Sequence, residues 1–209
     1  MKNFATKSEI WQMFTGIIEK TGVIKEVISA GTNTSFWIES ELAAELKIDQ
    51  SLSHNGICLT VEEIKDGQHR VTAIEETILK TNAGNWAAGN MLNLERCMQL
   101  NGRLDGHIVQ GHVDCIATCD EVIEKAGSWE YSFIFPEKFA SFIIEKGSVT
   151  VNGISLTCFN VTNNRFTVAI IPYTYEHTNM SSLQKEDEVN IEWDVVGKYV
   201  ARIIHIKAQ

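Results

Sequence analysis

The stretch SLSHNGICLTV at residues 51–61 recurs as SVTVNGISLTC at residues 148–158, 97 positions further along the chain. Three flanking blocks recur in the same order: FTGIIEKTGVIKEV (14–27) as VQGHVDCIATCDEV (109–122), ETILKTN (76–82) as YTYEHTN (173–179), and MLNLERC (91–97) as EVNIEWD (188–194). Their offsets stay between 95 and 97 residues, which one small insertion or deletion explains. Four matching blocks in one order indicate that a whole structural unit has been duplicated.

Each copy has the pattern of a small β-sheet protein. Runs rich in Val, Ile and Thr are separated by Asn, Gly, Asp and Ser turns, and apolar residues alternate with polar ones around Val71 and Ile191. One short helix-like stretch precedes the central phrase in each copy, at residues 40–47 and 136–146. A strand-rich unit of this size removes its exposed edges by closing on itself. The sequence therefore predicts an all-β fold of two similar, tandem β-barrels.

A different pattern follows the second copy. In VVGKYVARIIHIK (195–207), apolar residues recur at helical spacing, namely Val196, Tyr199, Val200, Ile203 and Ile204. This spacing predicts a C-terminal α-helix with one apolar stripe. The stripe packs either on its own barrel or on the same helix of other subunits, and the pattern alone leaves both options open.

The overall composition narrows the class of protein. The chain has 209 residues, of which 44% are hydrophobic, enough for two cores of domain size. Its net charge of −9 disfavours binding to nucleic acid. The lack of a long apolar run and of a signal-peptide pattern predicts a soluble, intracellular protein that does not span a membrane. Five scattered cysteines predict free thiols, and Cys115 and Cys119 lack the further Cys or His ligands that a zinc site needs.

The repeated phrase has two interpretations. Asn-Gly before a strand is a strong hairpin signal, so the phrase can be purely structural. However, small polar residues recur on one face of the following strand, Cys58 and Thr60 in the first copy and Ser155 and Thr157 in the second. A polar face that occurs twice favours two related pockets, and therefore two similar ligands.

Seven motifs carry a family resemblance: MFTGII (13–18), NGICLTV (55–61), NLERC (93–97), GHIVQGHVD (106–114), NGISLT (152–157), IIPYTYEHTN (170–179) and NIEWDVVGKYV (190–200). Together they resemble the riboflavin synthase family of the alpha-chain type, whose members contain lumazine-binding repeats. The resemblance implies an N-terminal extension (1–12), two Greek-key β-barrels (13–99 and 100–194) and a C-terminal oligomerisation helix (195–209), assembled as a homotrimer.

The resemblance also implies a reaction. Two molecules of 6,7-dimethyl-8-ribityllumazine would give riboflavin and 5-amino-6-(ribitylamino)uracil by transfer of a four-carbon unit, in the cytoplasm and with no metal or redox cofactor. Two copies of the repeat then match two copies of one substrate, one as donor and one as acceptor. Lumazine synthase is a further partner that the family suggests.

Substrate contacts carry over from the family wherever the motif letters match. In the first repeat they are Cys58, Leu59, Thr60, Thr72, Ala73, Ile74, Glu75, Glu76 and Thr77. In the second they are Lys146, Ser155, Leu156, Thr157, Ala169, Ile170, Ile171, Pro172, Tyr173 and Thr174. The mouths of the barrels are assigned to Gly16, Ile17, Ile18, Gly111, His112 and Val113. The family places the working site between the N-terminal barrel of one subunit and the C-terminal barrel of the next.

Three residues are candidates for the chemistry. His112 is the candidate for proton transfer because histidine titrates near neutrality, and its alternative is a surface or hydrogen-bonded strand histidine. Cys58 is either a nucleophile or, as favoured here, a polar wall. Ser51, together with His54, either places a water molecule or caps a turn.

One predicted ion pair and three rival functions complete the expectations. Asp194 and Lys198 resemble family positions near the site, but their spacing of four also fits an ordinary helical ion pair. The nearest rival is a lumazine- or flavin-binding antenna protein of the same fold. A flavoprotein reductase would need a Gly-rich nucleotide-binding turn, which is absent from the sequence, and a pure assembly module leaves the paired polar faces unexplained.

Overall fold

The structure, a computed structural model, describes residues 13–99 and 101–207. The first repeat contains β1 (Lys20–Ala30), β2 (Asn33–Glu39), η1 (Glu41–Ala44), β3 (Ser51–His54), β4 (Ile57–Thr60), β5 (Glu63–Lys65), β6 (Gln68–Ala73), α1 (Glu75–Lys80), η2 (Asn82–Asn85) and β7 (Met91–Arg96). The second contains β8 (Cys115–Lys125), β9 (Ser128–Ile134), η3 (Glu137–Phe142), β10 (Ser148–Val151), β11 (Ile154–Phe159), β12 (Arg165–Ile170), α2 (Pro172–His177), η4 (Asn179–Ser182) and β13 (Glu188–Trp193). The helix α3 (Val195–Lys207) follows. The predicted N-terminal extension lies outside the described residues.

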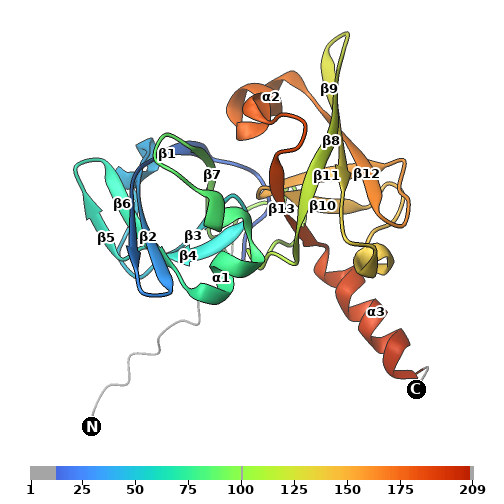
Figure 1. The fold of residues 1–209 in the computed structure, drawn as a ribbon, viewed down its shortest axis with the longest axis horizontal. Coiled ribbons are helices and arrows are strands. Elements are labelled where there is room, and N and C mark those ends of the chain that lie inside the picture. Colours follow the sequence, from blue (N-terminus) through green and yellow to red (C-terminus); the bar gives the residue numbers. More distant parts are fainter. Residues whose placement is uncertain (1–12, 100, 208–209) are drawn as a thin grey trace.

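The two repeats fold into two antiparallel sheets with equivalent strand orders (Figure 1). The second sheet is a closed six-stranded barrel, β10-β11-β12-β9-β8-β13. The first is a seven-stranded sheet, β4-β3-β7-β1-β2-β6-β5, whose ladder is not closed. The prediction of an all-β chain of two related units with a C-terminal helix is confirmed.

The sheets differ in closure because the first one is interrupted between β4 and β5. In the second repeat β11 runs on without a break and pairs with β12, with Cys158 opposite Val168. In the first repeat β4 ends at Thr60, and the separate strand β5 pairs with β6 instead, with Glu63 opposite Arg70. The two edges of the first sheet are therefore consecutive in the chain.

Each sheet encloses a separate apolar core, as the alternating pattern predicts. Val71 and Ala73 are fully buried in the first repeat, whereas Arg70 and Thr72 point outward. In the second repeat a group of aromatic side chains fills the barrel, including Phe133, Phe166 and Trp193. The two predicted helix-like stretches are present as the 3-10 helices η1 and η3.

Buried asparagines join the two repeats in a symmetric network. Asn93 donates from Nδ2 to the carbonyl of Asn152 at 2.9 Å and to Oδ1 of Asn179 at 2.8 Å. Its counterpart Asn190 donates in the same way to the carbonyl of Asn55 at 2.9 Å and to Oδ1 of Asn82 at 2.8 Å. Because these groups are buried, they need partners, and each repeat supplies them to the other.

The C-terminal helix α3 projects away from both sheets (Figure 1). None of its residues is buried, and the apolar stripe stays exposed, with Tyr199 at 69% and Ile204 at 62% of their full accessible surface. Of the two interpretations of Asp194 and Lys198, the ordinary helical ion pair between them is not formed. Lys198 instead binds Asp114 at 2.8 Å, while Asp194 accepts the N–H of Val196 at the start of the helix.

Candidate functional site

Each repeat carries a row of polar side chains across three neighbouring strands. Cys58 on β4 lies opposite Ser53 on β3, which lies opposite Glu95 on β7. Directly opposed residues in antiparallel strands share one face of the sheet, so these side chains lie side by side, on the face away from the core. The second repeat has the equivalent row of Ser155, Thr150 and Glu192.

The predicted residue Ser51 belongs to a parallel row in the first repeat. It lies opposite Thr60, and its carbonyl accepts a hydrogen bond from the thiol of Cys97 at 3.5 Å. Together with Ile17 and Glu95, it lines a cavity of about 550 Å³. The cavity is therefore large enough for a small molecule, although Ser51 itself is only 6% exposed.

The polar rows meet segments that come from the opposite repeat. The N–H of Cys58 donates to the carbonyl of Gly111 at 2.9 Å, and the N–H of Ser155 donates to the carbonyl of Gly16 at 2.8 Å. Both glycines have a φ of +77°, and a Cβ on either would lie 2.6 Å from the Cβ of its partner. Only glycine allows this approach. Each site is thus built by both repeats of one chain.

The crossing brings two predicted catalytic residues to the same place. His112 follows Gly111, whose carbonyl accepts the N–H of Cys58, and its side chain is exposed. Val113 packs against the core of the first repeat. At the second site the equivalent positions are Ile17 and Ile18, and Ile18 packs against the second core. The histidine is therefore specific to the first site.

The electrostatic surroundings of Cys58 favour its role as a polar wall of the site over a role as a nucleophile. Burial raises the pKa of its thiol, and the nearby carboxylate of Glu192 raises it further, whereas a hydrogen bond with Ser51 lowers it. A thiol with a raised pKa is mostly protonated at neutral pH and is a weak nucleophile.

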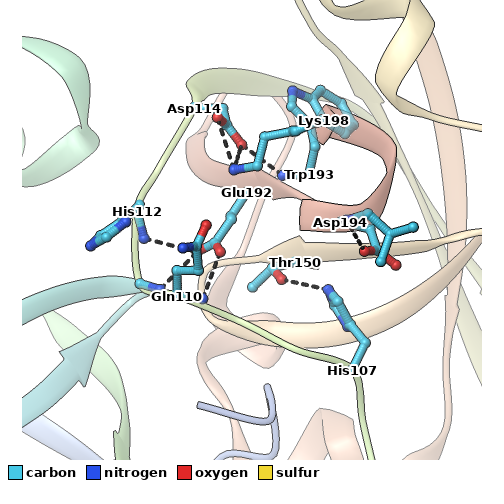
Figure 2. Close-up of polar contacts among 11 residues, drawn as sticks. His107, Gln110, His112, Asp114, Thr150, Glu192, Trp193, Asp194 and Lys198 are labelled. Atoms are coloured by element: carbon cyan, nitrogen blue, oxygen red, sulfur yellow. Dashed lines mark hydrogen bonds and ion pairs between the residues drawn. The ribbon is translucent and has the colours of Figure 1, made fainter. Parts of the chain in front are cut away.

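The second site contains a histidine that the sequence interpretation missed. His107 is 8% exposed, and its Nδ1 lies 2.7 Å from the hydroxyl of Ser155. Its Nε2 lies 3.2 Å from the hydroxyl of Thr150, as Figure 2 shows. Burial lowers the pKa of His107, so the ring is neutral near pH 7. His107 belongs to the motif GHIVQGHVD (106–114), which the sequence analysis singled out. Its counterpart in the first copy is Gln12, which lies outside the described residues.

Two buried carboxylates were also missed. Glu95 and Glu192 are 3% and 2% exposed, and burial raises the pKa of each to about 7. Figure 2 shows Glu192 bonded to the backbone of the segment that contains Gln110 and His112. The sequence did contain a signal for them, because glutamate stands at the same position of both repeats, 97 residues apart.

The other predicted contacts divide into outward and inward residues. Thr72, Ile74 and Thr77 in the first repeat, and Ala169, Ile171 and Thr174 in the second, are at least partly exposed. Glu75, Glu76, Pro172 and Tyr173 are exposed on the short helices α1 and α2, which replace the predicted continuation of strand and turn. Leu59, Ala73 and Ile170 are buried in the cores, and Leu156 packs against one. These four offer a ligand only their backbone.

Two further expectations concern single residues. The prediction that His54 acts at the site is wrong, because it lies in the first core with Nε2 2.8 Å from Nε2 of His69. Lys146 is exposed in the turn before β10, with its N–H bonded to the carbonyl of Cys158 beside Thr157. Its backbone therefore lies at the outer end of the second site.

Metal and membrane features were considered for the described residues. No group of three or more His, Cys, Asp or Glu side chains among them is arranged to hold a metal ion. The five cysteines are unpaired, and Cys115 and Cys119 are buried in the second core. None of the helices within residues 13–99 and 101–207 is long and apolar enough to cross a membrane.

Comparison with known proteins agrees with this geometry. Residues 15–97 and 110–194 each match the lumazine binding domain family. The riboflavin synthase of Bacillus subtilis is 38% identical over 194 residues, which cover 92% of this chain and 90% of the relative. That of Mycobacterium bovis is 38% identical over 200 residues, which cover 92% and 98%. The chain belongs to the riboflavin synthase family.

Riboflavin synthases are transferases, and this member of the family is accordingly an enzyme of that class.

Solved structures of LumP share the fold of this chain. The complex of LumP with riboflavin has a TM-score of 0.81 at 21% identity and covers 86% of this chain and 98% of LumP. The complex with 6,7-dimethyl-8-(1'-D-ribityl) lumazine has a TM-score of 0.78. At this identity the likeness concerns the fold alone.

Proposed function

We propose that this protein converts two molecules of 6,7-dimethyl-8-ribityllumazine into riboflavin and 5-amino-6-(ribitylamino)uracil. One molecule donates a four-carbon unit to the other, and the two products together contain all the atoms of the two substrates. The observation that carries the proposal is the pair of equivalent but unequal sites. One combines Cys58 with His112, and the other combines Ser155 with His107. Equivalent sites suit two copies of one substrate, and unequal residues suit two roles.

The chemistry makes modest demands on the protein. A proton must leave the C7 methyl group of one lumazine, and the other lumazine must be activated for attack. Holding two flat rings in a reactive orientation supplies roughly 7 to 11 kcal/mol in favourable cases. We assign proton transfer to His112, because its side chain is exposed beside the first site. Cys58 forms a polar wall there, and Ser51 places a water molecule or hydroxide in its cavity.

The proposed assembly is a homotrimer in the cytoplasm. The exposed stripe of α3 supports it, because an unpartnered apolar face of this length is unusual on a monomer. In the proposed trimer the first site of one subunit faces the second site of the next, which brings donor and acceptor together. The reaction as proposed uses no metal or redox cofactor. Lumazine synthase, which makes the substrate, is the proposed partner protein.

Turnover by chelator-treated protein tests the proposal. The purified chain is incubated with 6,7-dimethyl-8-ribityllumazine, and the absorbance of riboflavin is followed. We expect riboflavin and the uracil product in equal amounts. Tight binding of the lumazine without turnover would instead support the antenna protein, the rival function with the same fold.

A further inference from the structure

Two equivalent segments, residues 14–18 and 109–113, lie between the repeats and against each other. Phe14 and Val109 form an antiparallel bridge, with N–H to carbonyl distances of 2.7 and 3.0 Å. Beyond this bridge each segment crosses to the opposite repeat, where Gly111 bonds to Cys58 and Gly16 bonds to Ser155. The position of each site wall therefore depends on what holds these segments.

A buried carboxylate of the segment's own repeat holds each segment from behind. Glu192 accepts the N–H of Gln110 at 2.7 Å through Oε1, and those of Gly111 and His112 at 2.9 Å each through Oε2. Glu95 accepts the N–H and hydroxyl of Thr15 at 2.6 and 2.7 Å through Oε1, and the N–H of Gly16 at 3.0 Å through Oε2. Each carboxylate thus takes three donors of one segment.

We propose that Glu192 is the positioning residue of the first site and Glu95 that of the second, each acting across the junction between the repeats. Glu192 sets the position of His112 relative to Cys58, although it belongs to the second repeat. Glu95 sets the position of Ile17 relative to Ser155. The assignment of catalysis to these sites rests on the proposed function, whereas the crossed positioning rests on the hydrogen bonds alone.

A carboxylate is the side chain that these positions require. Three donors converge on its two oxygens, and an ionised carboxylate accepts from all of them. Glutamine keeps only one acceptor oxygen and turns an NH₂ group toward a backbone N–H, so a buried donor loses its partner. Burial raises the pKa of both carboxyls to about 7. Hydrogen bonds from Thr15 and Gly16 oppose this shift at Glu95, and those from Gln110 and His112, with the charge of Lys198, oppose it at Glu192. The substitutions Glu192→Gln and Glu95→Gln are therefore isosteric but disruptive.

The reactivity of a thiol at each site reports the position of the segment without any need for turnover. In a Cys97→Ser background, Cys58 is the reporter of the first site, because the remaining three cysteines are buried. In a Cys58→Ser and Cys97→Ser background, the thiol introduced by Ser155→Cys reports the second. The rate of alkylation by iodoacetamide is measured for each reporter, with and without each Glu→Gln substitution.

Rates are compared after extrapolation to full ionisation of the thiol. This step is necessary because the charge of Glu192 itself raises the pKa of Cys58, so its removal would increase the thiolate fraction. We expect Glu192→Gln to speed labelling of Cys58 by about tenfold, the effect of losing about 1.4 kcal/mol of local stability. The thiol at position 155 should stay within about twofold of its reference rate. Glu95→Gln should show the reverse pattern.

Equal acceleration at both thiols would overturn the proposal, because it would show general loosening. Acceleration only at the thiol of the carboxylate's own repeat would also overturn it. If a Glu→Gln protein does not fold, Thr15→Val is the milder variant. It removes the hydroxyl, which donates to Glu95 at 2.7 Å and accepts the N–H of Ile17 at 3.3 Å, and it keeps both backbone hydrogen bonds to Glu95. It should speed labelling at position 155 and not at Cys58. Crossed labelling in a protein without turnover would reject the proposed reaction and keep the positioning.

Discussion

The Nδ1 atom of His107 lies 2.7 Å from the Ser155 hydroxyl, while its Nε2 lies 3.2 Å from the Thr150 hydroxyl. A histidine held at both nitrogens has a fixed ring orientation. Burial lowers its pKa, so the ring is neutral and can accept a hydrogen bond from one hydroxyl while donating one to the other. The hydroxyl of Ser155 is thereby oriented by a histidine at the second site, whereas the thiol of Cys58 at the first site interacts with Ser51.

We predict that His107→Asn lowers kcat by about 10- to 100-fold, because the amide can still bond to Ser155 but cannot take up its proton. Stopped-flow single-turnover rates for His107→Asn, Ser155→Ala and the double variant measure the effect. If His107 acts through Ser155, the double variant is no slower than the slower single variant. Independent, multiplying effects would contradict this role.

His112 and Cys58 are predicted to differ in kind, although they share one site. His112→Gln should lower kcat by roughly 10² to 10⁴ with little change in substrate affinity, because it removes a proton-transfer group. Cys58→Ser should keep measurable turnover, since the hydroxyl still offers a hydrogen bond. Single-turnover rates between pH 5 and 9 check both variants. An inactive Cys58→Ser beside a nearly normal His112→Gln would reverse the assignment and make the thiol the chemical group.

The fold was predictable because its main cause is visible in the sequence. Duplication at a nearly constant offset, with period-two alternation, predicts two similar sheets before any motif is interpreted. The open ladder of the first sheet was not predictable. It depends on the break between β4 and β5 after Thr60, whereas the equivalent strand β11 of the second copy continues to Phe159.

The site was predictable only in part. Small polar residues such as Cys58 and Ser155 stand out in strands, but a glutamate in a strand is usually exposed to solvent, so Glu95 and Glu192 looked ordinary. Their burial follows from the way the two repeats pack, which no single strand encodes. His54 differs from them, because the period-two alternation of its strand places it on the core face with Leu52, opposite to the face of Ser51 and Ser53.

The asparagine network predicts that the repeats are rigidly joined. Asn93→Ala removes two hydrogen bonds donated by its side chain and one accepted from the N–H of Asn179, all buried. We expect the free energy of unfolding to fall by about 3 to 5 kcal/mol, because the partners are left unsatisfied. Urea denaturation measures it. Asn85→Ala is the control, since its one hydrogen bond to Glu188 is exposed and its loss should cost about 0.5 kcal/mol or less.

The stripe of α3 is predicted to hold the subunits together. Ile203 and Ile204 are 52% and 62% exposed in the single chain. Replacing both with Asp would place charges in an apolar contact that has no partner for them, which is costly. We expect the mass in solution, measured by light scattering, to fall to that of the monomer. If the variant kept the mass of the unmodified protein, the helix would have no part in assembly.

The buried pair of His54 and His69 is predicted to make the first repeat sensitive to acid. Burial holds the pKa of His54 well below its usual value and lowers that of His69 to about 4. The folded state therefore binds fewer protons than the unfolded state between pH 6.5 and 4, and stability is lost as the pH falls through this window. The second repeat has Val151 and Phe166 at the equivalent positions. The double variant His54→Val, His69→Phe should resist this loss.

Urea denaturation of both proteins at each pH isolates the effect of the pair. Glu95 and Glu192 act in the opposite direction, because a carboxyl whose pKa is raised to about 7 favours the folded state as the pH falls from 7 to 4.5. Both proteins keep these carboxyls, so the difference between them reports the histidines. We expect that difference to grow by at least roughly 2 to 3 kcal/mol between pH 6.5 and 4, which is the contribution of His69 alone, because His54 adds to it in the same direction. The exposed His177, replaced by Gln, is the control and should leave the pH dependence unchanged. Parallel stability curves for the unmodified protein and the double variant would show that the buried pair does not govern acid sensitivity.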